Sequence, residues 1–220
     1  MGASPDDPDA EDNERPRHEA AVHHAFYMAL YPVTRELFRR FIDAPEREHG
    51  ALSDDSAVNW VSCNDADHLV RLLNERSVQG LRYRLPTEVE WEYACRAGTQ
   101  TRFHFGDDPG YRHLTEFAWC AENTWEVGEC CPQPVGLKPA NAFGLFDMHG
   151  NVWEWTSDRW VGYEALRSQG AAATREPTRV LRGGGFCHEG RYLRASDRDH
   201  YAPTYRHYYT GMRLCLDAQS

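Results

Sequence analysis

The chain has 220 residues and a net charge of −10, from 34 acidic and 24 basic side chains. Hydrophobic residues make up 41% of the sequence, which is enough to build a core and excludes general disorder. The acidic balance opposes binding to nucleic acid or to an anionic membrane surface. No apolar run is long enough to cross a membrane, and the first residues carry no secretion signal. We therefore expect a globular, cytoplasmic protein with neither nucleic acid nor membrane as its partner.

The first 19 residues are acidic and contain proline, which predicts a mobile or loosely docked arm over residues 1–19. A single domain is expected to follow over residues 20–220. It begins with an apolar and aromatic run at residues 24–30 that predicts a strand.

Three helices are predicted next, from capping residues and the spacing of apolar positions. Thr34 is the expected N-cap of the first, which the proline and glycine within residues 45–50 close. Ser62 or Asn64 caps the second helix. The Thr-Glu-Val-Glu run at residues 87–90 fits a capping box and begins the third.

The remaining sequence is mostly irregular. Residues 99–145 are rich in glycine, proline and aromatic residues without periodicity, which indicates functional or ligand-supported loops. Short strands are expected at residues 151–156, 180–184 and 211–216. Helices followed by short strands and long loops predict an α+β domain.

Seven cysteines are scattered without a Cys-x-x-Cys pair: Cys63, Cys95, Cys120, Cys130, Cys131, Cys187 and Cys215. An odd number with irregular spacing predicts neither a disulfide framework nor a tetrahedral zinc site. Reduced thiols of a cytosolic protein are the simplest interpretation. We expect most of them to be small buried apolar residues.

Four groups of residues, in order along the chain, carry a resemblance to a known family. They are Tyr31–Thr34, Arg84–Ala94, Asn141–Trp155, and Arg179–Gly184 with Gly211–Leu214. The third group is too long and too unusual in composition to match by chance. The chain resembles the formylglycine-generating enzyme, or sulfatase-modifying factor, family over about residues 20–216. This resemblance implies a C-type-lectin-like fold with small sheets, packed helices and many loops.

The resemblance also implies a calcium site. At the matching positions Asp147 and Glu154 give side chains, and Gly150 and Val152 give backbone carbonyls. Calcium prefers such mixed oxygen ligands from one irregular segment. In the alternative interpretation the two carboxylates accept hydrogen bonds from loop amides. Calcium is the cofactor that we expect.

A copper site is not expected. Formylglycine-generating enzymes bind copper(I) through two cysteines, three and eight residues after the serine of a Gly-Gly-Ser triplet. In this sequence Gly185 stands at the serine, and His188 and Leu193 stand at the two cysteines. Cys187 lies one residue early, so it is a catalytic candidate only in the alternative interpretation. That alternative is a copper-dependent oxidase that converts a cysteine of a target protein to formylglycine.

Residues 185–210 are rich in tyrosine, histidine, aspartate and arginine, a mixture typical of recognition surfaces. We therefore predict a domain that binds a protein or small-molecule ligand. Tyr192 and Arg198 are expected to be structural in part, and the stretch 199–209 to be more exposed. The candidate ligand contacts are His188, Tyr192, Asp197, Asp199, His200, Tyr201, Tyr205, His207, Tyr208 and Tyr209.

Nearby tryptophans at 153, 155 and 160 are interpreted as core residues rather than as the wall of a binding site. Two other interpretations of residues 185–210, here called the tail, stay open. Variable proteins of diversity-generating retroelements resemble the same family, and adenine mutagenesis reaches codons for the tyrosine, histidine and aspartate that abound here. A structural subunit would instead place Tyr205, Tyr208 and Tyr209 in a contact between copies. Either role suits one module of a larger protein or assembly.

Overall fold

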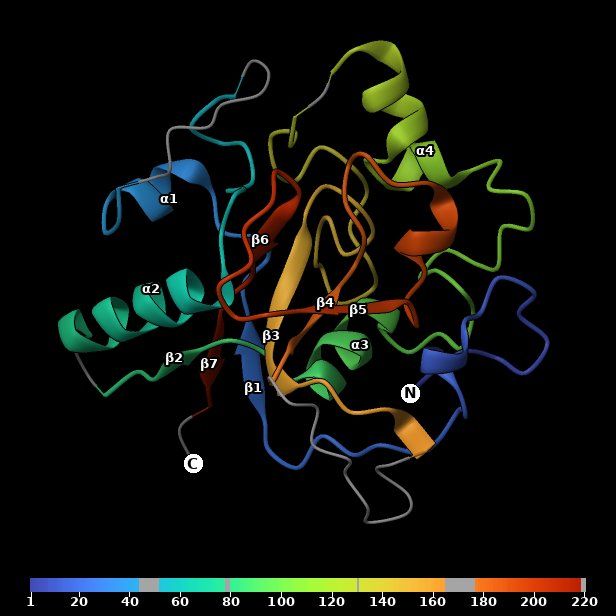
Figure 1. The fold of residues 1–220 in the computed structure, drawn as a ribbon, viewed down its shortest axis with the longest axis horizontal. Helices are drawn as coiled ribbons and strands as arrows, with labels where there is room; N and C mark the ends of the chain where they lie inside the picture. Colours follow the sequence, from blue (N-terminus) through green and yellow to red (C-terminus); the bar gives the residue numbers. More distant parts are fainter. Residues whose placement is uncertain (44–51, 78–79, 130, 165–176, 219–220) are drawn as a thin grey trace.

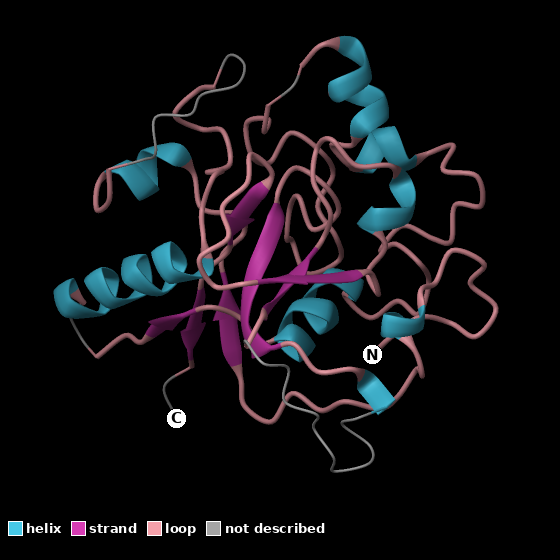
Figure 2. Cartoon of the chain, viewed as in Figure 1, coloured by secondary structure: helices cyan, strands magenta, loops and turns pink. Residues whose placement is uncertain are grey.

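The computed structural model describes residues 1–43, 52–77, 80–129, 131–164 and 177–218. Within these ranges the helices are α1 (Arg35–Arg39), α2 (Cys63–Arg76), α3 (Glu88–Arg96) and α4 (Leu114–Phe117) (Figure 1). Short 3-10 turns lie at Asp12–Glu14, Ala121–Asn123, Trp125–Val127 and Gly190–Leu193. Much of the chain runs in loops around two small sheets (Figure 2), as the irregular sequence predicts. No described helix combines the length and apolarity needed to cross a membrane.

The three main helices begin at predicted caps. Thr34, Ser62 and Thr87 each accept a hydrogen bond from the backbone N–H three residues later. At Ser62 and Thr87 the carboxylate of that third residue also accepts from the backbone of the cap, which completes a capping box. Ser62, rather than Asn64, is therefore the cap of α2. The expected end of the first helix, at residues 45–50, lies outside the described residues.

Two sheets form the centre of the domain. The first has the strand order β1 (Phe26–Met28), β7 (Cys215–Asp217) and β2 (Tyr83–Arg84), all antiparallel. The second has the order β5 (Arg198–Tyr201), β4 (Arg179–Arg182), β3 (Trp153–Arg159) and β6 (Thr210–Met212), with β3 and β6 parallel. The α+β prediction is confirmed.

Two strand predictions need correction. The strand expected at residues 211–216 is two strands in different sheets, β6 and β7. They separate at Arg213, whose fully buried guanidinium donates to the backbone carbonyls of Ala29 and Leu30 and so ties the crossing between the sheets. Strand β5 was not expected, because its polar sequence shows no apolar alternation.

The main core lies between α2 and the sheets, since α2 packs on β2 and β3. It includes Trp155, Leu181 and Met212, all fully buried. Helix α3 packs on β3 and β4 and buries Trp91 in a second cluster. Trp153 and Trp155 are core residues, 2% and 0% exposed, as the sequence predicts.

Residues 1–19 are not a separate mobile arm, contrary to the expectation. Arg194, which is 1% exposed, donates to both carboxylate oxygens of Glu14 at 2.7 Å. It also donates to Asp7 at 3.1 Å. Glu14 itself is fully buried, so these acidic residues hold the segment against the domain. Their composition alone gave no sign of the buried cations that pair with them.

Candidate functional site

A continuous group of contacting rings brings together segments that are far apart in the sequence. We call it the aromatic cluster. It unites the loop before α2, the turn at Trp125–Val127, the start of β3, and the chain on either side of β5, which is coloured orange to red in Figure 1. Its members are Trp60, Trp125, Trp153, Phe186, His188, Tyr192, Tyr201, Tyr205, His207, Tyr208 and Tyr209.

His207 lies near the middle of the aromatic cluster. Its ring centroid is 4.1 Å from that of Tyr209, 4.3 Å from that of Tyr208 and 5.9 Å from that of Trp60. The ring centroid of Tyr209 in turn lies 4.7 Å from that of His188. Aromatic pairs at these separations stabilise one another beyond simple burial, so the rings form a rigid surface.

The aromatic cluster is partly open to solvent. Trp125 is 47% exposed, whereas the tyrosines at 205, 208 and 209 are half-buried. Sequence reasoning missed Trp60 and Trp125 as site residues. Trp125 falls in the irregular stretch predicted to hold ligand-supported loops, which was the available signal. Trp60 gave no such signal, because only the fold brings its loop beside His207.

The polar atoms of the aromatic cluster are largely uncharged. Burial lowers the pKa of His188 to about 4, so its ring is neutral at neutral pH. Its Nδ1 lies 3.4 Å from the Sγ of Cys187. Burial also lowers the pKa of His207 and raises that of Tyr209. The hydroxyl oxygens of Tyr205 and Tyr209 are hydrogen-bonded at 3.1 Å.

Two of the predicted ligand contacts, Asp197 and His200, lie outside the aromatic cluster. Asp197 is only 4% exposed and sits 3.5 Å from Arg194, and burial raises its pKa well above the usual range. It belongs to the buried charges, so we correct its assignment as a ligand contact. His200 stacks on Trp160 with centroids 4.1 Å apart. It lies on the opposite side of β5 from Tyr201, because successive strand residues alternate in direction.

Two further residues of β5, Asp199 and Arg198, have different surroundings. Asp199 is half-buried, which raises its pKa, and its Oδ1 accepts from the backbone of His200. The side chain of Asp199 also hydrogen-bonds with that of Tyr201, so Asp199 borders the aromatic cluster. Arg198 is buried and donates to both oxygens of Glu88 at 2.7 Å, which is a structural role.

The predicted calcium ligands fit that ion only in part. Asp147 is buried, and its Oδ1 has no hydrogen-bond partner among the described residues, which leaves one oxygen for a cation. The carboxylate of Glu154 instead accepts from Arg213 at 2.9–3.1 Å and from Trp91 at 2.7 Å. No group of three or more His, Cys, Asp or Glu side chains in the described ranges could hold a metal.

The backbone between these two carboxylates is closely packed. Gly150 has a φ of +85°, and a Cβ there would lie 2.0 Å from the carbonyl oxygen of Trp119. Val152 is buried at the start of β3. Glycine at 150 is therefore needed for packing, whether or not its carbonyl binds a cation.

The cysteines differ in exposure. Of those that the structure describes, Cys187 alone is partly exposed. Burial raises the pKa of the thiols at 63, 95, 120 and 215 to about 12, so they remain protonated and are poor ligands for a soft metal. Cys130 lies outside the described residues.

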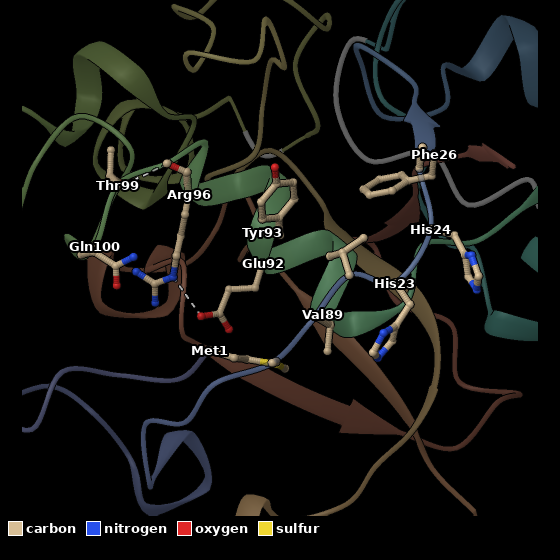
Figure 3. A pocket seen from close by; sticks show the side chains of 14 residues that line it. Met1, His23, His24, Phe26, Val89, Glu92, Tyr93, Arg96, Thr99 and Gln100 are labelled. Carbon is tan, nitrogen blue, oxygen red and sulfur yellow. Dashed lines mark hydrogen bonds and ion pairs between the residues drawn. The ribbon is translucent and has the colours of Figure 1, made fainter. Parts of the chain in front are cut away.

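A second candidate site is the pocket in Figure 3, with a volume of about 670 Å³. It is lined by the segment 20–26 and by the exposed side of α3, including Val89 and Tyr93. Its buried charges are already paired. Glu92 accepts from Arg96 and from the backbone N–H of Gly2, both at 2.9 Å. The aromatic cluster is therefore the stronger candidate for ligand binding.

Comparison with known proteins agrees with this architecture. The family model described as "Sulfatase-modifying factor enzyme 1-like domain" matches residues 1–218. The chain belongs to this family. The match includes residues 1–19, in agreement with their docking on the domain.

Individual known proteins are similar to this one over most of the chain. The formylglycine-generating enzyme of Bos taurus is 30% identical over 84% of this chain and 63% of its own length. PvdO from Pseudomonas aeruginosa, a solved structure, superposes with a TM-score of 0.84 at 27% identity, covering 99% of this chain and 90% of PvdO. The Treponema denticola variable protein 1 gives 0.72 at 22% identity, over 88% and 84%. These neighbours confirm the C-type-lectin-like fold.

Proposed function

We propose that this member of the sulfatase-modifying factor family is a recognition domain that binds its ligand at the aromatic cluster. The observation that supports the proposal is the continuous ring surface, which four separate segments build around His207 and His188. Rings fixed against one another offer a large contact area at low entropic cost. A protein or a small molecule is the proposed partner.

The members of the aromatic cluster have different proposed roles. Trp60, Trp125 and Tyr208 supply the apolar contact area, because Trp125 is 47% exposed and stacks on Tyr208, whose ring also contacts that of Trp60. The hydroxyl groups of Tyr205 and Tyr209 orient the ligand through hydrogen bonds. Both hydroxyls can donate or accept, so they suit several polar groups.

The alternative is a copper-dependent oxidase that converts a cysteine of a target protein to formylglycine. The name of the bovine relative favours it, but the chain spans only 63% of that enzyme's length. The two cysteine positions of the family motif are His188 and Leu193 here, and the side chain of Leu193 is fully buried. A neutral imidazole and an aliphatic group do not make the two-thiolate site that suits copper(I).

Copper(I) titration of the reduced protein tests this choice. We expect weak binding, and we expect neither Cys187→Ser nor Cys130→Ser to change it by more than about twofold, because no cysteine pair is predicted. Cys63→Ser is the matched control, since that thiol is buried in the core. Tight copper binding that both the Cys187→Ser and the Cys130→Ser variants abolish, with oxidation of a cysteine peptide, would establish the oxidase instead.

Three further properties remain part of the proposal. Calcium near Asp147 is supported by the unpartnered Oδ1 but not by the pairing of Glu154 with Arg213, so the proposed ligand binding does not depend on calcium.

A cytoplasmic location is supported by the free state of the described cysteines. A tail diversified by a retroelement predicts a reverse transcriptase and an imperfect copy of this segment beside the gene, and their absence from the genomic DNA would exclude that origin.

A further inference from the structure

Three contacting rings of the aromatic cluster and one aliphatic side chain form a surface that is open to solvent. Trp125 is 47% exposed, and its ring stacks on that of Tyr208 with centroids 6.0 Å apart and an interplanar angle of 19°. The centroid of Tyr208 lies 6.3 Å from that of Trp60. Val127, which is 64% exposed, belongs to the same 3-10 turn as Trp125. We call these four residues the open face. Exposed apolar groups gathered in this way mark interaction surfaces.

The segment that carries Trp125 is acidic. Residues 114–137 contain four glutamates and no lysine, arginine or histidine. Three of these glutamates, Glu122, Glu126 and Glu129, are exposed, and all three lie within four residues of Trp125. Glu126 follows Trp125 directly in the 3-10 turn. Carboxylates therefore border the exposed indole ring.

Buried contacts hold this acidic turn against the tail. The hydroxyl of Thr124, which is fully buried, donates to the carbonyl of Cys120 at 2.8 Å. The backbone N–H of Ala121 donates to the carbonyl of His188 at 3.0 Å, and that of Glu129 donates to the carbonyl of Thr124 at 2.9 Å. The glutamates thus project from a fixed backbone, so a ligand that binds them orders little of the chain.

The basic groups of the tail do not cancel this negative charge. Arg191 and Arg206 are exposed, but they are paired with other carboxylates at 3.2 Å and 2.6 Å. Burial lowers the pKa of His188 to about 4 and also lowers the pKa of His207, so both rings are uncharged at neutral pH. The open face therefore combines aromatic rings with neighbouring negative charge.

We propose that the open face binds an arginine-bearing segment of a partner protein. This inference rests on the proposed binding function and names the class of its partner. A guanidinium is planar, so it can stack on an indole ring while its N–H groups donate to a carboxylate beside that ring. The ammonium of lysine is more strongly hydrated and offers no flat surface to stack. A segment with several cations suits the site better than one small cation, because the three carboxylates are spread over residues 122–129.

Three blocked pentapeptides test the proposal, in which alanine alternates with arginine, with lysine or with citrulline. Citrulline has the shape of arginine but carries no charge. Binding is followed through the indole N–H signals of the seven tryptophans in nitrogen-15-labelled protein. We expect the arginine peptide to shift the signals of Trp60 and Trp125, and to bind at least about tenfold more tightly than the citrulline peptide. The lysine peptide should bind with intermediate affinity.

Two variants with the same change in net charge locate the interaction. Glu126→Gln removes the carboxylate next to Trp125, and we expect it to weaken binding of the arginine peptide about two- to fivefold. Glu75→Gln is the matched control, because Glu75 is exposed and lies about 18 Å along α2 from Cys63, the first residue of that helix. It should leave the affinity for the arginine peptide unchanged. Neither variant should alter binding of the citrulline peptide.

The outcomes separate this inference from the proposed function. The arginine-bearing partner is wrong if the arginine peptide does not bind, if the citrulline peptide binds as tightly, or if Glu126→Gln and Glu75→Gln weaken binding equally. In those cases the binding function still stands if benzamide, a neutral aromatic compound, shifts the signals of Trp60 and Trp125. If neither benzamide nor any of the peptides shifts these signals, both the inference and the proposed function are wrong.

Discussion

Residues 182–209 contribute both to the aromatic cluster and to a group of buried arginines. The two regions differ in whether their buried polar atoms have partners. Arg182, Arg194 and Arg198 are nearly inaccessible, and each is paired with a buried carboxylate. In the aromatic cluster, Nε1 of Trp153 and Nδ1 of His207 are buried and have no hydrogen-bond partner among the described residues. Folded proteins pair almost all buried polar groups. These exceptions are consistent with the proposed binding of a ligand at the aromatic cluster.

The largest effect on stability is expected from removing one of the buried arginines. Arg194→Met leaves the carboxylates of Glu14 and Asp197 buried without their cation, and leaves Asp7 paired with Arg102 alone. Removing one partner of a buried ion pair typically costs about 3–5 kcal/mol, so the free energy of unfolding should fall by that amount. Urea denaturation at neutral pH measures it.

An exposed ion pair provides the control for this prediction. Arg206 pairs with Asp65 at 2.6 Å, but its side chain is 50% exposed. Arg206→Met should therefore change the free energy of unfolding by less than about 1 kcal/mol. Equal losses in the two variants would show that the buried arginines do not hold residues 1–19 in place.

A pH-dependent effect of intermediate size is expected in the aromatic cluster. Burial lowers the pKa of His188 to about 4 from a usual value of 6.5. As the pH falls from 6.5 to about 4, the unfolded chain binds a proton that the folded chain does not. The free energy of unfolding should therefore decrease in that window, by at most about 1.4 kcal/mol per pH unit.

His188→Gln isolates this contribution, because glutamine does not titrate. Carboxylates with raised pKa values, such as Asp197 and Asp199, oppose the trend equally in both proteins. The difference between the two stability curves should shrink as the pH falls from 6.5 to about 4. Curves that stay parallel across this window would mean that His188 is not neutral through burial.

A smaller effect is expected for Trp125, and it separates a role in ligand binding from a role in stability. Trp125 is 47% exposed, so Trp125→Ala should change the free energy of unfolding by no more than about 0.5 kcal/mol. Loss of one aromatic contact should nevertheless weaken the binding of a small aromatic amide, benzamide, to the aromatic cluster about two- to tenfold. Unchanged affinity, measured by titration with benzamide, would remove Trp125 from the binding surface.

Calcium is expected to have the smallest effect. Of the two predicted carboxylate ligands, only Asp147 has an oxygen without a partner among the described residues, so we expect weak binding with a stabilisation of less than about 1 kcal/mol in millimolar calcium. Thermal unfolding with calcium or with a chelator measures it, and Asp147→Asn should remove most of the difference. A stabilisation of several kcal/mol would show that Glu154 leaves Arg213 to bind the ion.

The fold was predictable where local rules decide it. The caps at Thr34, Ser62 and Thr87 follow from side-chain chemistry within one turn, and the motif ending at Trp155 indicates the family. The docking of residues 1–19 was not predictable, because the partner of Glu14 is Arg194, at the other end of the chain. Such pairings depend on the tertiary structure.

The candidate site was predictable only in part, for the same reason. The composition of the tail predicted a recognition surface there, and its five tyrosines all join the aromatic cluster. Composition does not distinguish Asp197, which the fold buries, from Tyr208, which the fold leaves half-exposed. It also does not place Trp60 and Trp125 beside the tail, since those contacts arise from loops that meet only in the folded chain.

A crystal structure of the protein with benzamide tests the central claim most directly. We predict the ring of benzamide, a small aromatic amide, against the rings of the aromatic cluster. Benzamide bound in the pocket beside α3 instead would contradict the account.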